Sequence, residues 1–417
     1  MKVGIYTLGC KVNTYESEYI MGLFKEKGYI ICDPEEDCDV YVINTCTVTN
    51  NSDKKDKKII NHVKNRNKDA IIVVCGCFVE SNKDYNFDGV DIVIGNYNKS
   101  KIVDLVEEYR LNKNKIFLRE NMMSVPFEDM MITSFPNRTR AFVKIQDGCE
   151  NYCSYCVIPF VRGRCRSKEM SKVLEEIKHL TDNGYKEIVL TGIHTGSYGV
   201  DLGIKFSHLL KEILKNKDLK HLRISSIEIT ELDDDFFKLL ENDVLCNHLH
   251  IPLQSGSKNI LKAMNRKYTK EEFLQMVNKI RSIRPDISLT TDLIVGFPGE
   301  TDDDFKETME FLRVLNFSKI HVFPYSKRNG TKAARMDNQI DDATKKERVK
   351  QVLELSSIGE KEYFNKFIDK NVEVLIEKYE DGYSYGHTSN YLYLKINEKL
   401  EHNKTYIVKV KQEMFTK

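Results

Sequence analysis

The sequence lacks any apolar run long enough to cross a membrane, because nowhere do roughly eighteen apolar residues follow one another. Its first residues, MKVGIYTLGC, contain only a short apolar run and no cleavage region typical of a signal peptide. We therefore expect a cytoplasmic protein without a membrane partner. Internal repeats and low-complexity tracts are also missing, and the composition is that of an ordinary globular protein.

An excess of charge of one sign is missing as well. The 64 Lys and Arg residues face 63 Asp and Glu residues, so the formal net charge is +1. This balance argues against a protein that is polyelectrolytic throughout. Any nucleic-acid site therefore has to be a local basic patch. At 417 residues the chain is long enough for about two to four domains.

The sequence has 11 cysteines, an odd number, so they cannot all be paired in disulfides. Because the cytosol keeps thiols reduced, we expect metal ligands and buried thiols instead of a disulfide framework. The stretch QDGCENYCSYC places three of them, Cys149, Cys153 and Cys156, within eight residues. A structural zinc ion and a 4Fe–4S cluster each take four ligands, so one coordination position is left open by this motif.

Two kinds of site fit three thiolates. They can hold three irons of a 4Fe–4S cluster and leave the fourth iron to a ligand with its own donors. Alternatively, a distant His completes a zinc site, or the three are unconnected buried thiols. Cys149 directly follows a predicted strand at 141–146, and barrel active sites lie at that end of a strand, which favours the cluster.

In the N-terminal part, short β-branched runs alternate with helix-compatible stretches. The runs are 2–7, 40–45, 71–75 and 91–94. This alternation predicts a small α/β domain with a mostly parallel sheet, whose ligands gather at the carboxyl ends of the strands. Cys10, Cys46 and Cys77 follow the first three runs. We therefore expect them to converge at one edge of the sheet.

A second alternation begins after an irregular segment, 113–137, that is predicted to be a linker. Its candidate strands are 141–146, 187–191, 221–226, 247–252, 287–293 and 319–324. Six strand–helix units fall short of the eight of a closed barrel, so we predict an open, partial (β/α)6 barrel. Close-spaced strands after a charged helix at 344–367 predict a small C-terminal β-barrel. The predicted domains are therefore 1–125, 135–355 and 356–417.

The stretch GCENYCSYC resembles the CxxxCxxC motif of radical S-adenosylmethionine (SAM) enzymes. The resemblance implies that its three cysteines hold a 4Fe–4S cluster whose open iron is chelated by the amino and carboxylate groups of SAM. In that superfamily the reduced cluster passes an electron to SAM and generates a 5′-deoxyadenosyl radical. It also implies that Tyr155 packs near the adenine, although an aromatic residue here is equally compatible with a core position.

Three N-terminal stretches, TLGCKVN, VINTCTVT and CGCFVE, are similar to the N-terminal domain of the methylthiotransferases. There, three dispersed cysteines hold an auxiliary 4Fe–4S cluster, and the matching residues are Cys10, Cys46 and Cys77. Cys75 competes with Cys77, but the family's ligand follows a glycine, as Cys77 does. Stretches such as HLHIPLQSGS and TTDLIVGFPGET extend the resemblance over nearly the whole chain, including a C-terminal module like the RNA-binding TRAM domain. The remaining cysteines are expected to be ordinary thiols: Cys32, Cys38, Cys165 and Cys246.

Methylthiotransferases replace an unactivated C–H bond by CH3–S, and such a bond offers no acidic proton to a general base. The resemblance implies that SAM supplies both the methyl group and the radical, and that the auxiliary cluster carries the sulfur. It also implies two partners, a sulfur source and an electron donor such as a flavodoxin or ferredoxin. Its branches act on isopentenyladenosine in tRNA, on a ribosomal-protein aspartate, or on C2 of N6-threonylcarbamoyladenosine at position 37 of tRNA. GCKVN resembles the third branch. A hypothesis of another class is a non-catalytic RNA-binding protein with structural zinc.

Basic residues flank the three-cysteine motif: Arg138, Arg140, Lys144, Arg162, Arg164, Arg166 and Lys168. They predict binding of an RNA backbone or of a carboxylate, with a solvated loop as the alternative. Because RGR follows the cluster motif in the family, Arg162 and Arg164 are the candidate substrate-binding residues. Candidates for SAM binding follow or end predicted barrel strands: Gly192, Ser225, Gln254 and Asp292. His194 is as compatible with a structural as with a catalytic role.

The C-terminal module, 371–417, carries equal numbers of lysines and acidic residues. An RNA-binding module of this composition would use one basic face together with aromatic rings, which stack on single-stranded bases. Its alternating tyrosines are compatible with base stacking or with a barrel core: Tyr383, Tyr385, Tyr391 and Tyr393.

Overall fold

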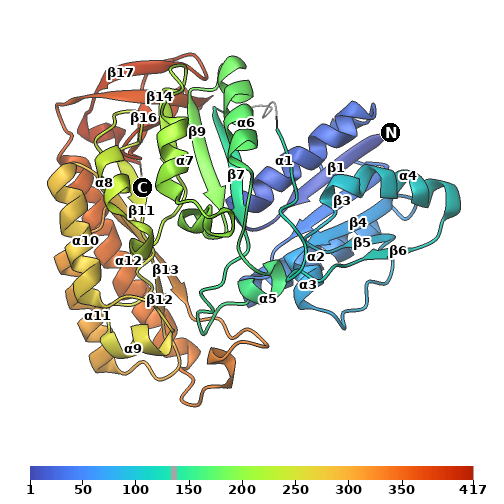
Figure 1. Cartoon of the computed structure of the whole chain (residues 1–417), viewed down its shortest axis with the longest axis horizontal. Helices are drawn as coiled ribbons and strands as arrows, with labels where there is room; N and C mark the ends of the chain where they lie inside the picture. Colours follow the sequence, from blue (N-terminus) through green and yellow to red (C-terminus); the bar gives the residue numbers. More distant parts are fainter. Residues whose placement is uncertain (133–138, 417) are drawn as a thin grey trace.

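The computed structural model describes residues 1–132 and 139–416 and places two α/β parts side by side, followed by an antiparallel module (Figure 1). This arrangement confirms the predicted fold class. No helix in the described residues is both long and apolar enough to cross a membrane. Pro136 and Arg138 lie outside the described residues, as does the end of the predicted linker.

The N-terminal sheet has six parallel strands in the order β2-β1-β3-β4-β5-β6. Its strands are β1 (Lys2–Thr7), β2 (Ile30–Cys32), β3 (Val40–Thr45), β4 (Ile71–Gly76), β5 (Ile92–Ile94) and β6 (Ile116–Leu118). Its helices are α1 (Lys11–Glu26), α2 (Asn50–Arg66), α3 (Cys77–Ser81) and α4 (Ile102–Asn112). The central strands β3 and β4 are buried on both faces, as their continuous β-branched runs require.

The prediction that residues 113–137 form only a linker is wrong at β6. This strand extends the sheet by pairing in parallel with β5. This strand has only three residues, IFL, which are too few to show a periodic pattern in the sequence. It reaches the edge of the sheet because the preceding helix α4 brings the chain back to β5.

Six parallel strands form the second α/β part, in agreement with the predicted partial barrel. They are β7 (Arg140–Asp147), β9 (Glu187–Gly192), β10 (His221–Ile224), β11 (His248–His250), β12 (Ser288–Val295) and β13 (Lys319–Pro324). The short β8 (Arg166–Ser167) runs antiparallel to β7. Backbone hydrogen bonds from Leu222 N–H to Val244 O and from Cys246 N–H to Leu222 O connect β10 to the chain entering β11.

The helices of this part are α5 (Ile158–Arg162), α6 (Met170–Asp182), α7 (Phe206–Ile213), α8 (Asp234–Leu239), α9 (Lys258–Ala263), α10 (Lys270–Ile283), α11 (Asp302–Leu315) and α12 (Asp342–Asn365). Most of them lie outside the strands, whereas α5 lies beside α3 of the N-terminal part (Figure 1). Thr269 and Thr301 begin α10 and α11 with capping boxes, in which the Thr side chain accepts a backbone N–H and an acidic side chain returns the bond. The inward faces of the helices and strands share one large apolar core.

The C-terminal module is a four-stranded antiparallel sheet in the order β16-β15-β14-β17. Its strands are β14 (Asn371–Glu380), β15 (Tyr383–Thr388), β16 (Tyr393–Ile396) and β17 (Thr405–Lys409). Tyr391 fastens it to the barrel, because its ring stacks on His248 at 4.7 Å between centroids and lies under the Arg223 guanidinium at 4.7 Å. A TRAM-like barrel remains a prediction for this module.

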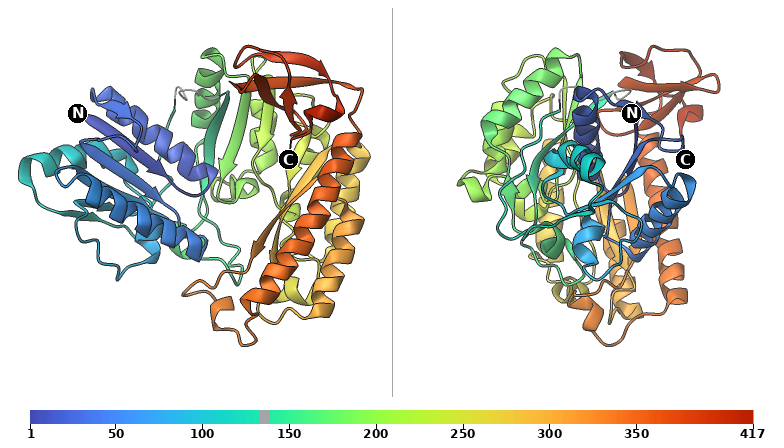
Figure 2. Two further views of the ribbon diagram at one scale, coloured as in Figure 1. Left: turned by 180° about the vertical axis from the view of Figure 1, so that it is seen from behind. Right: turned by 90° about the vertical axis from the view of Figure 1, so that its right-hand side faces the viewer.

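Helix α1 lies between the N-terminal sheet and strands β7 and β9 in all views (Figures 1 and 2). Tyr15 of α1 is fully buried in the barrel core, and its hydroxyl contacts Met130 O at 2.6 Å and Glu176 Oε1 at 2.8 Å. The helix that follows Cys10 therefore packs against both α/β parts.

Candidate active site

Cys10, Cys46 and Cys77 meet at the carboxyl ends of β1, β3 and β4. Cys10 is the residue before α1, Cys46 directly follows β3, and Cys77 begins α3. Gly9 makes the approach possible, because it has φ +99° and a Cβ there would lie 2.7 Å from the Cβ of Cys46. Burial and the neighbouring Cys77 thiol raise the pKa of Cys46 to about 12, so these thiols lie close enough to interact.

Cys75 lies in a different environment from Cys77. It is fully buried in the apolar core of the N-terminal sheet, and its thiol lies 3.8 Å from Asn44 Oδ1. Cys77, in contrast, accepts a hydrogen bond from Asn96 Nδ2 at 3.4 Å at the sheet edge. The geometry therefore favours Cys77 as the third thiol of the N-terminal set.

The other cysteines are distributed differently from the expectation. Cys32 and Cys38 are joined by a disulfide, so the prediction that both are ordinary thiols is wrong. They lie six residues apart, on β2 and in the turn before β3, where the chain reverses beside Gly4. Cys165 and Cys246 are buried free thiols, as expected.

The second set, Cys149, Cys153 and Cys156, lies on the loop between β7 and α5. Gly148 permits the turn after β7, because it has φ +76° and a Cβ there would lie 1.9 Å from Arg164 O. Cys149 N–H then donates to Gly163 O, and Cys156 N–H donates to Cys153 O, both at 3.0 Å. Burial raises the pKa of Cys156 to about 12, and the two neighbouring thiols add to the shift.

Each thiol set has a buried arginine beside it. Arg266 Nη1 lies 3.3 Å from Cys153 Sγ, and Arg266 is itself paired with Glu228 at 2.8 Å. Arg162, fully buried, is the main positive charge acting on Cys10, where it opposes the rise in pKa that burial causes. Buried thiols next to a fixed cation suit an anionic iron–sulfur cluster, since metal binding requires deprotonated thiolates.

Three thiols with an open fourth corner therefore fit the donor set of a 4Fe–4S cluster at both places. In the described part of the chain no group of three His, Cys, Asp or Glu side chains converges on a single metal ion. A cluster does not need such convergence, because each thiolate binds a different iron.

His194 lies beside the second set, at the end of β9. Its Nε2 is 2.6 Å from Glu231 Oε1 and its Nδ1 is 2.6 Å from Ser197 Oγ. Burial would lower the pKa of His194, but hydrogen bonds to Cys149 and Glu231 raise it to about 11. The imidazolium thus adds positive charge next to Cys149.

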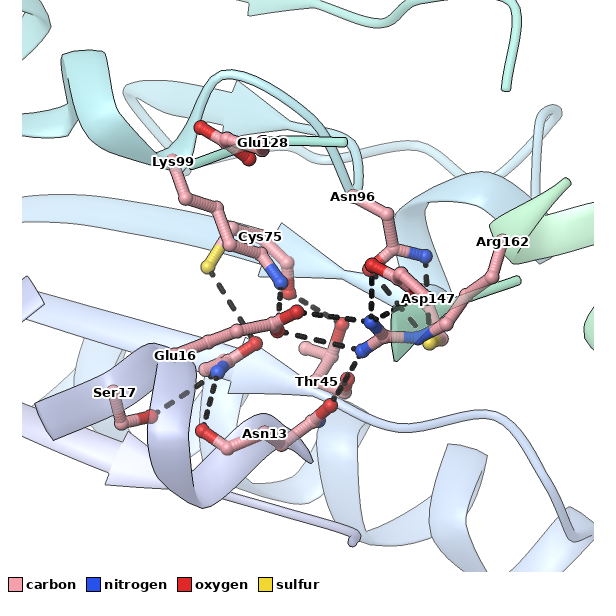
Figure 3. A network of polar contacts seen from close by, with 12 residues as sticks. Asn13, Glu16, Ser17, Thr45, Cys75, Asn96, Lys99, Glu128, Asp147 and Arg162 are labelled. Atoms are coloured by element: carbon pink, nitrogen blue, oxygen red, sulfur yellow. Dashed lines mark hydrogen bonds and ion pairs between the residues drawn. The ribbon is translucent and has the colours of Figure 1, made fainter. Parts of the chain in front are cut away.

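A buried ionic network connects α1 with β7 and α5 next to the first thiol set (Figure 3). Glu16 of α1 accepts hydrogen bonds from Lys99, Lys144 and Arg162. Burial would raise the pKa of Glu16, but these cations hold it well below its ordinary value. Arg162 also donates to Asp147 at 3.1 Å and to Asn13 Oδ1 at 2.8 Å.

Two side-chain amides carry this network to the thiols. Asn13 Nδ2 donates to Leu8 O at 2.6 Å and to Thr45 O at 2.8 Å, and thereby holds the residues next to Cys10 and Cys46. Asn96 Nδ2 contacts Cys77 Sγ and also Val161 O at 2.8 Å in α5. Sequence patterns could not identify either asparagine, since their partners lie 32 and 65 residues away.

The prediction that the basic residues around the motif bind an RNA backbone or a carboxylate ligand does not hold for four of them, which are buried and paired with carboxylates of the protein itself. The buried cations and their partners are Arg162 with Glu16 and Asp147, Lys144 with Glu16 and Asp147, Arg166 with Asp147, and Lys168 with Glu176. Glu16 lies 128 residues from Lys144 in sequence, and Glu176 lies eight residues beyond Lys168, the last of these basic residues, so a local count of charges includes neither. Arg162 is therefore not free to bind substrate, whereas Arg164 is exposed and lines a cavity of about 560 Å³ with Glu150.

The candidate SAM residues occupy two sides of the barrel. A Cβ on Gly192 would lie 2.9 Å from Gln146 Oε1, and Ser225 Oγ is 3.2 Å from Thr195 Oγ1. Asp292 is inside β12, not at its end, and its Oδ2 lies 3.3 Å from His250 Nε2. Gln254 lies four residues beyond β11, with φ +67°, and its N–H donates to Asp292 O.

Tyr155 packs against a small apolar cluster formed by α9, Phe297 and Tyr325. Burial raises the pKa of its hydroxyl well above 10. Tyr155 is therefore a core residue, one of the two roles that the sequence allowed. Contact of its ring with adenine stays a prediction.

Comparison with known proteins agrees with this geometry. Residues 143–312 match the radical SAM superfamily, and residues 2–95 match a family described as Uncharacterized protein family UPF0004. The threonylcarbamoyladenosine tRNA methylthiotransferase MtaB of Bacillus subtilis is 44% identical over 401 residues, which cover 94% of this chain and 89% of that protein. The chain belongs to the radical SAM methylthiotransferase family.

Other relatives of this methylthiotransferase include MtaB of Thermotoga maritima, which is 41% identical over 90% of this chain and 87% of that protein. The tRNA-2-methylthio-N(6)-dimethylallyladenosine synthase of Acetivibrio thermocellus is 37% identical over 89% and 79%. Among solved structures, the radical SAM methyltransferase TsrM of Kitasatospora setae has the same fold, with a TM-score of 0.57 at 13% identity over 80% of this chain and 76% of that one. The methylthiotransferase is thus an enzyme that uses SAM and 4Fe–4S clusters, which sets aside the non-catalytic zinc protein.

Proposed function

We propose that this enzyme inserts a methylthio group at C2 of N6-threonylcarbamoyladenosine, at position 37 next to the anticodon of tRNA. The observation that carries the proposal is the pair of three-thiol sets joined through α1 and α5 by Arg162 and Asn96. Identities of 44% and 41% to two proteins named for this reaction support the choice of substrate.

Cys10, Cys46 and Cys77 would hold the auxiliary cluster, and Cys149, Cys153 and Cys156 the cluster that binds SAM. When bound, SAM and the clusters supply the radical that removes an unactivated hydrogen, together with the sulfur and the methyl group. The chain's own residues position these groups: Glu16, Asp147 and Arg162 lock α1 onto the barrel in a buried network that excludes water.

Around SAM we assign Gly192, Ser225, Gln254 and Asp292 as lining residues, with Tyr155 behind the cluster loop. Arg164 remains the candidate for contact with the substrate, because its side chain is exposed next to the motif. The electron donor and the sulfur source are further partners in this proposal, and the cytoplasm, where tRNA is found, is the proposed location.

RNA contact by the C-terminal module has support from one face of its sheet. Lys395 Nζ lies 3.8 Å from the ring centroid of Tyr383, and Lys378 Nζ lies 4.9 Å from that of Tyr385. Rings paired with cations suit single-stranded bases and phosphates. Tyr391 is not available for this role, because its ring is stacked on His248.

Nucleoside mass spectrometry of tRNA tests the substrate. We expect cells without the gene to lose 2-methylthio-N6-threonylcarbamoyladenosine, to accumulate the form without the methylthio group, and to recover when the wild-type gene is returned. Loss of the methylthio form of isopentenyladenosine instead would assign the enzyme to the branch of the Acetivibrio relative. If both tRNA nucleosides were unchanged while mass spectrometry of ribosomal proteins showed that an aspartate had lost its methylthio group, the enzyme would belong to the ribosomal-protein branch.

A further inference from the structure

A hollow of about 460 Å³ lies beside the loop that carries the second cysteine set. Two of the thiol residues, Cys153 and Cys156, line it, and the segment 330–336 forms the opposite wall. Ala333 N–H donates to Ser154 O at 2.7 Å, so that wall is fixed to the cysteine loop. The hollow therefore reaches from solvent to the residues proposed to hold the SAM-binding cluster.

Two exposed aromatic rings stand at the rim of this hollow. Tyr152 is 46% exposed and Phe160 is 61% exposed, and they contact each other edge to face at 6.2 Å between centroids. Tyr152 has φ +46°, a conformation that a non-glycine residue adopts only when its surroundings impose it. Large exposed rings of this kind are typical of anchors in protein interfaces.

The charge of the hollow has one sign. Lys332 and Arg335 line it, both side chains are exposed, and no carboxylate is among the lining residues. Within residues 1–132 and 139–416, neither cation forms an ion pair. Unpaired cations around an apolar rim are complementary to an acidic partner, and such charges mainly accelerate its association.

The position of the hollow restricts what this partner does. Cys153 and Cys156 line the hollow and Cys149 does not, so a partner seated there lies beside two of the thiols proposed to hold the cluster. A partner here needs no contact with the reacting atoms, but it does need to be near the cluster. Weak electron-transfer complexes bury little surface, so such a partner needs only a small contact area.

We propose that this hollow, formed by Tyr152, Phe160, Lys332 and Arg335 over Cys153 and Cys156, is the docking site for the electron donor. The donor is a small acidic protein that carries one electron on an exposed flavin or iron–sulfur group. It loses that electron to the cluster and is oxidised, and no atom is transferred. The inference rests on the proposed function, because it requires a cluster at the second thiol set.

The test compares two reductants. Charge reversal of both cations, Lys332→Glu with Arg335→Glu, is expected to reduce 5′-deoxyadenosine formation driven by reduced flavodoxin by about tenfold or more at low salt. The rate with dithionite, a small inorganic reductant that needs no docking site, should stay within about twofold of wild type. The wild-type rate with flavodoxin should also fall steeply as salt is added, and the variant's should not.

A matched control reverses two exposed lysines at the other end of the barrel, Lys217→Glu with Lys220→Glu, and should leave both rates unchanged. The iron content and the visible spectrum show whether each variant carries its 4Fe–4S clusters. Lys332→Gln is a milder variant, because it removes one positive charge without reversing it.

An unchanged flavodoxin-driven rate in the charge-reversal variant would overturn the docking site. An equal loss with dithionite would also overturn it, since the residues would then support the cluster itself. A large loss of tRNA affinity without a loss of flavodoxin-driven cleavage would make the hollow an RNA surface. If the wild-type enzyme cleaved SAM with neither reductant, the proposed function would fail first.

Discussion

Asn96 donates a hydrogen bond to the sulfur of Cys77, and the same amide nitrogen lies 2.8 Å from the carbonyl oxygen of Val161 in α5. One side chain therefore contacts a thiol of the first set and the helix that begins two residues after Cys156. Hydrogen bonds to cluster sulfurs favour the more negative, reduced form of an iron–sulfur centre.

Replacing Asn96 by Leu should lower the reduction potential of the auxiliary cluster. A hydrogen bond of this kind contributes about 1 kcal/mol, which corresponds to roughly 40 mV for a one-electron couple. A redox titration followed by electron paramagnetic resonance measures the change. The potential of the cluster on Cys149, Cys153 and Cys156 serves as the internal control and should not move. An unchanged auxiliary potential would show that the amide does not act on the sulfur.

Substitutions in the two thiol sets should affect different steps of the reaction. Serine at Cys149, Cys153 or Cys156 should abolish reductive cleavage of SAM, because no open iron is then held there. Serine at Cys10, Cys46 or Cys77 should leave cleavage intact but stop formation of the methylthio nucleoside.

Cys75→Ser is the matched control for the first set, since Cys75 is two residues from Cys77 but lies in the apolar core. It should retain both activities and lose only stability. Methylthio product from a Cys77→Ser enzyme, or its absence in Cys75→Ser at full iron content, would contradict the assignment of Cys77.

The sequence predicts the fold class, the six parallel barrel strands and both thiol sets, because each leaves a local signal. Strand runs carry β-branched residues, and Cys10, Cys46 and Cys77 stand directly after such runs. The charge network leaves no such signal. Lys144 and Arg162 look like a basic patch in the sequence, and only the fold brings Glu16 to them from 128 and 146 residues away. The disulfide of Cys32 and Cys38 was not predicted for a different reason, because the reducing cytosol expected for this protein argues against disulfide formation.

Removal of the Glu16 charge should destabilise the contact between the two α/β parts. Glu16→Gln leaves Lys99, Lys144 and Arg162 buried around a neutral amide, and breaking a buried ionic network from one side costs about 3–5 kcal/mol. Urea unfolding at neutral pH measures the change.

The exposed Glu26, on the same helix, is the control, and Glu26→Gln should change the free energy of unfolding by less than about 0.5 kcal/mol. Equal stabilities of the two variants would mean that the cations around Glu16 are compensated in another way.

The joint between barrel and C-terminal module should weaken in acid. Burial lowers the pKa of His248 well below its ordinary value of 6.5, and the positive charge of Arg223 acts in the same direction. His248 is thus neutral in the folded protein while the unfolded chain binds a proton below pH 6.5. The neutral His248 therefore contributes fully to the free energy of unfolding above pH 6.5. This contribution is lost as the pH falls, by up to about 2 kcal/mol at pH 5.

His248→Phe keeps a ring against Tyr391 but cannot titrate, so its free energy of unfolding should fall less between pH 7 and pH 5 than that of wild type. Urea unfolding at both values, at matched iron content, gives the difference. The exposed His402 provides the comparison, and His402→Phe should keep the full wild-type loss. If His248→Phe lost as much stability as wild type on acidification, a different buried group would be responsible for the acid sensitivity of this joint.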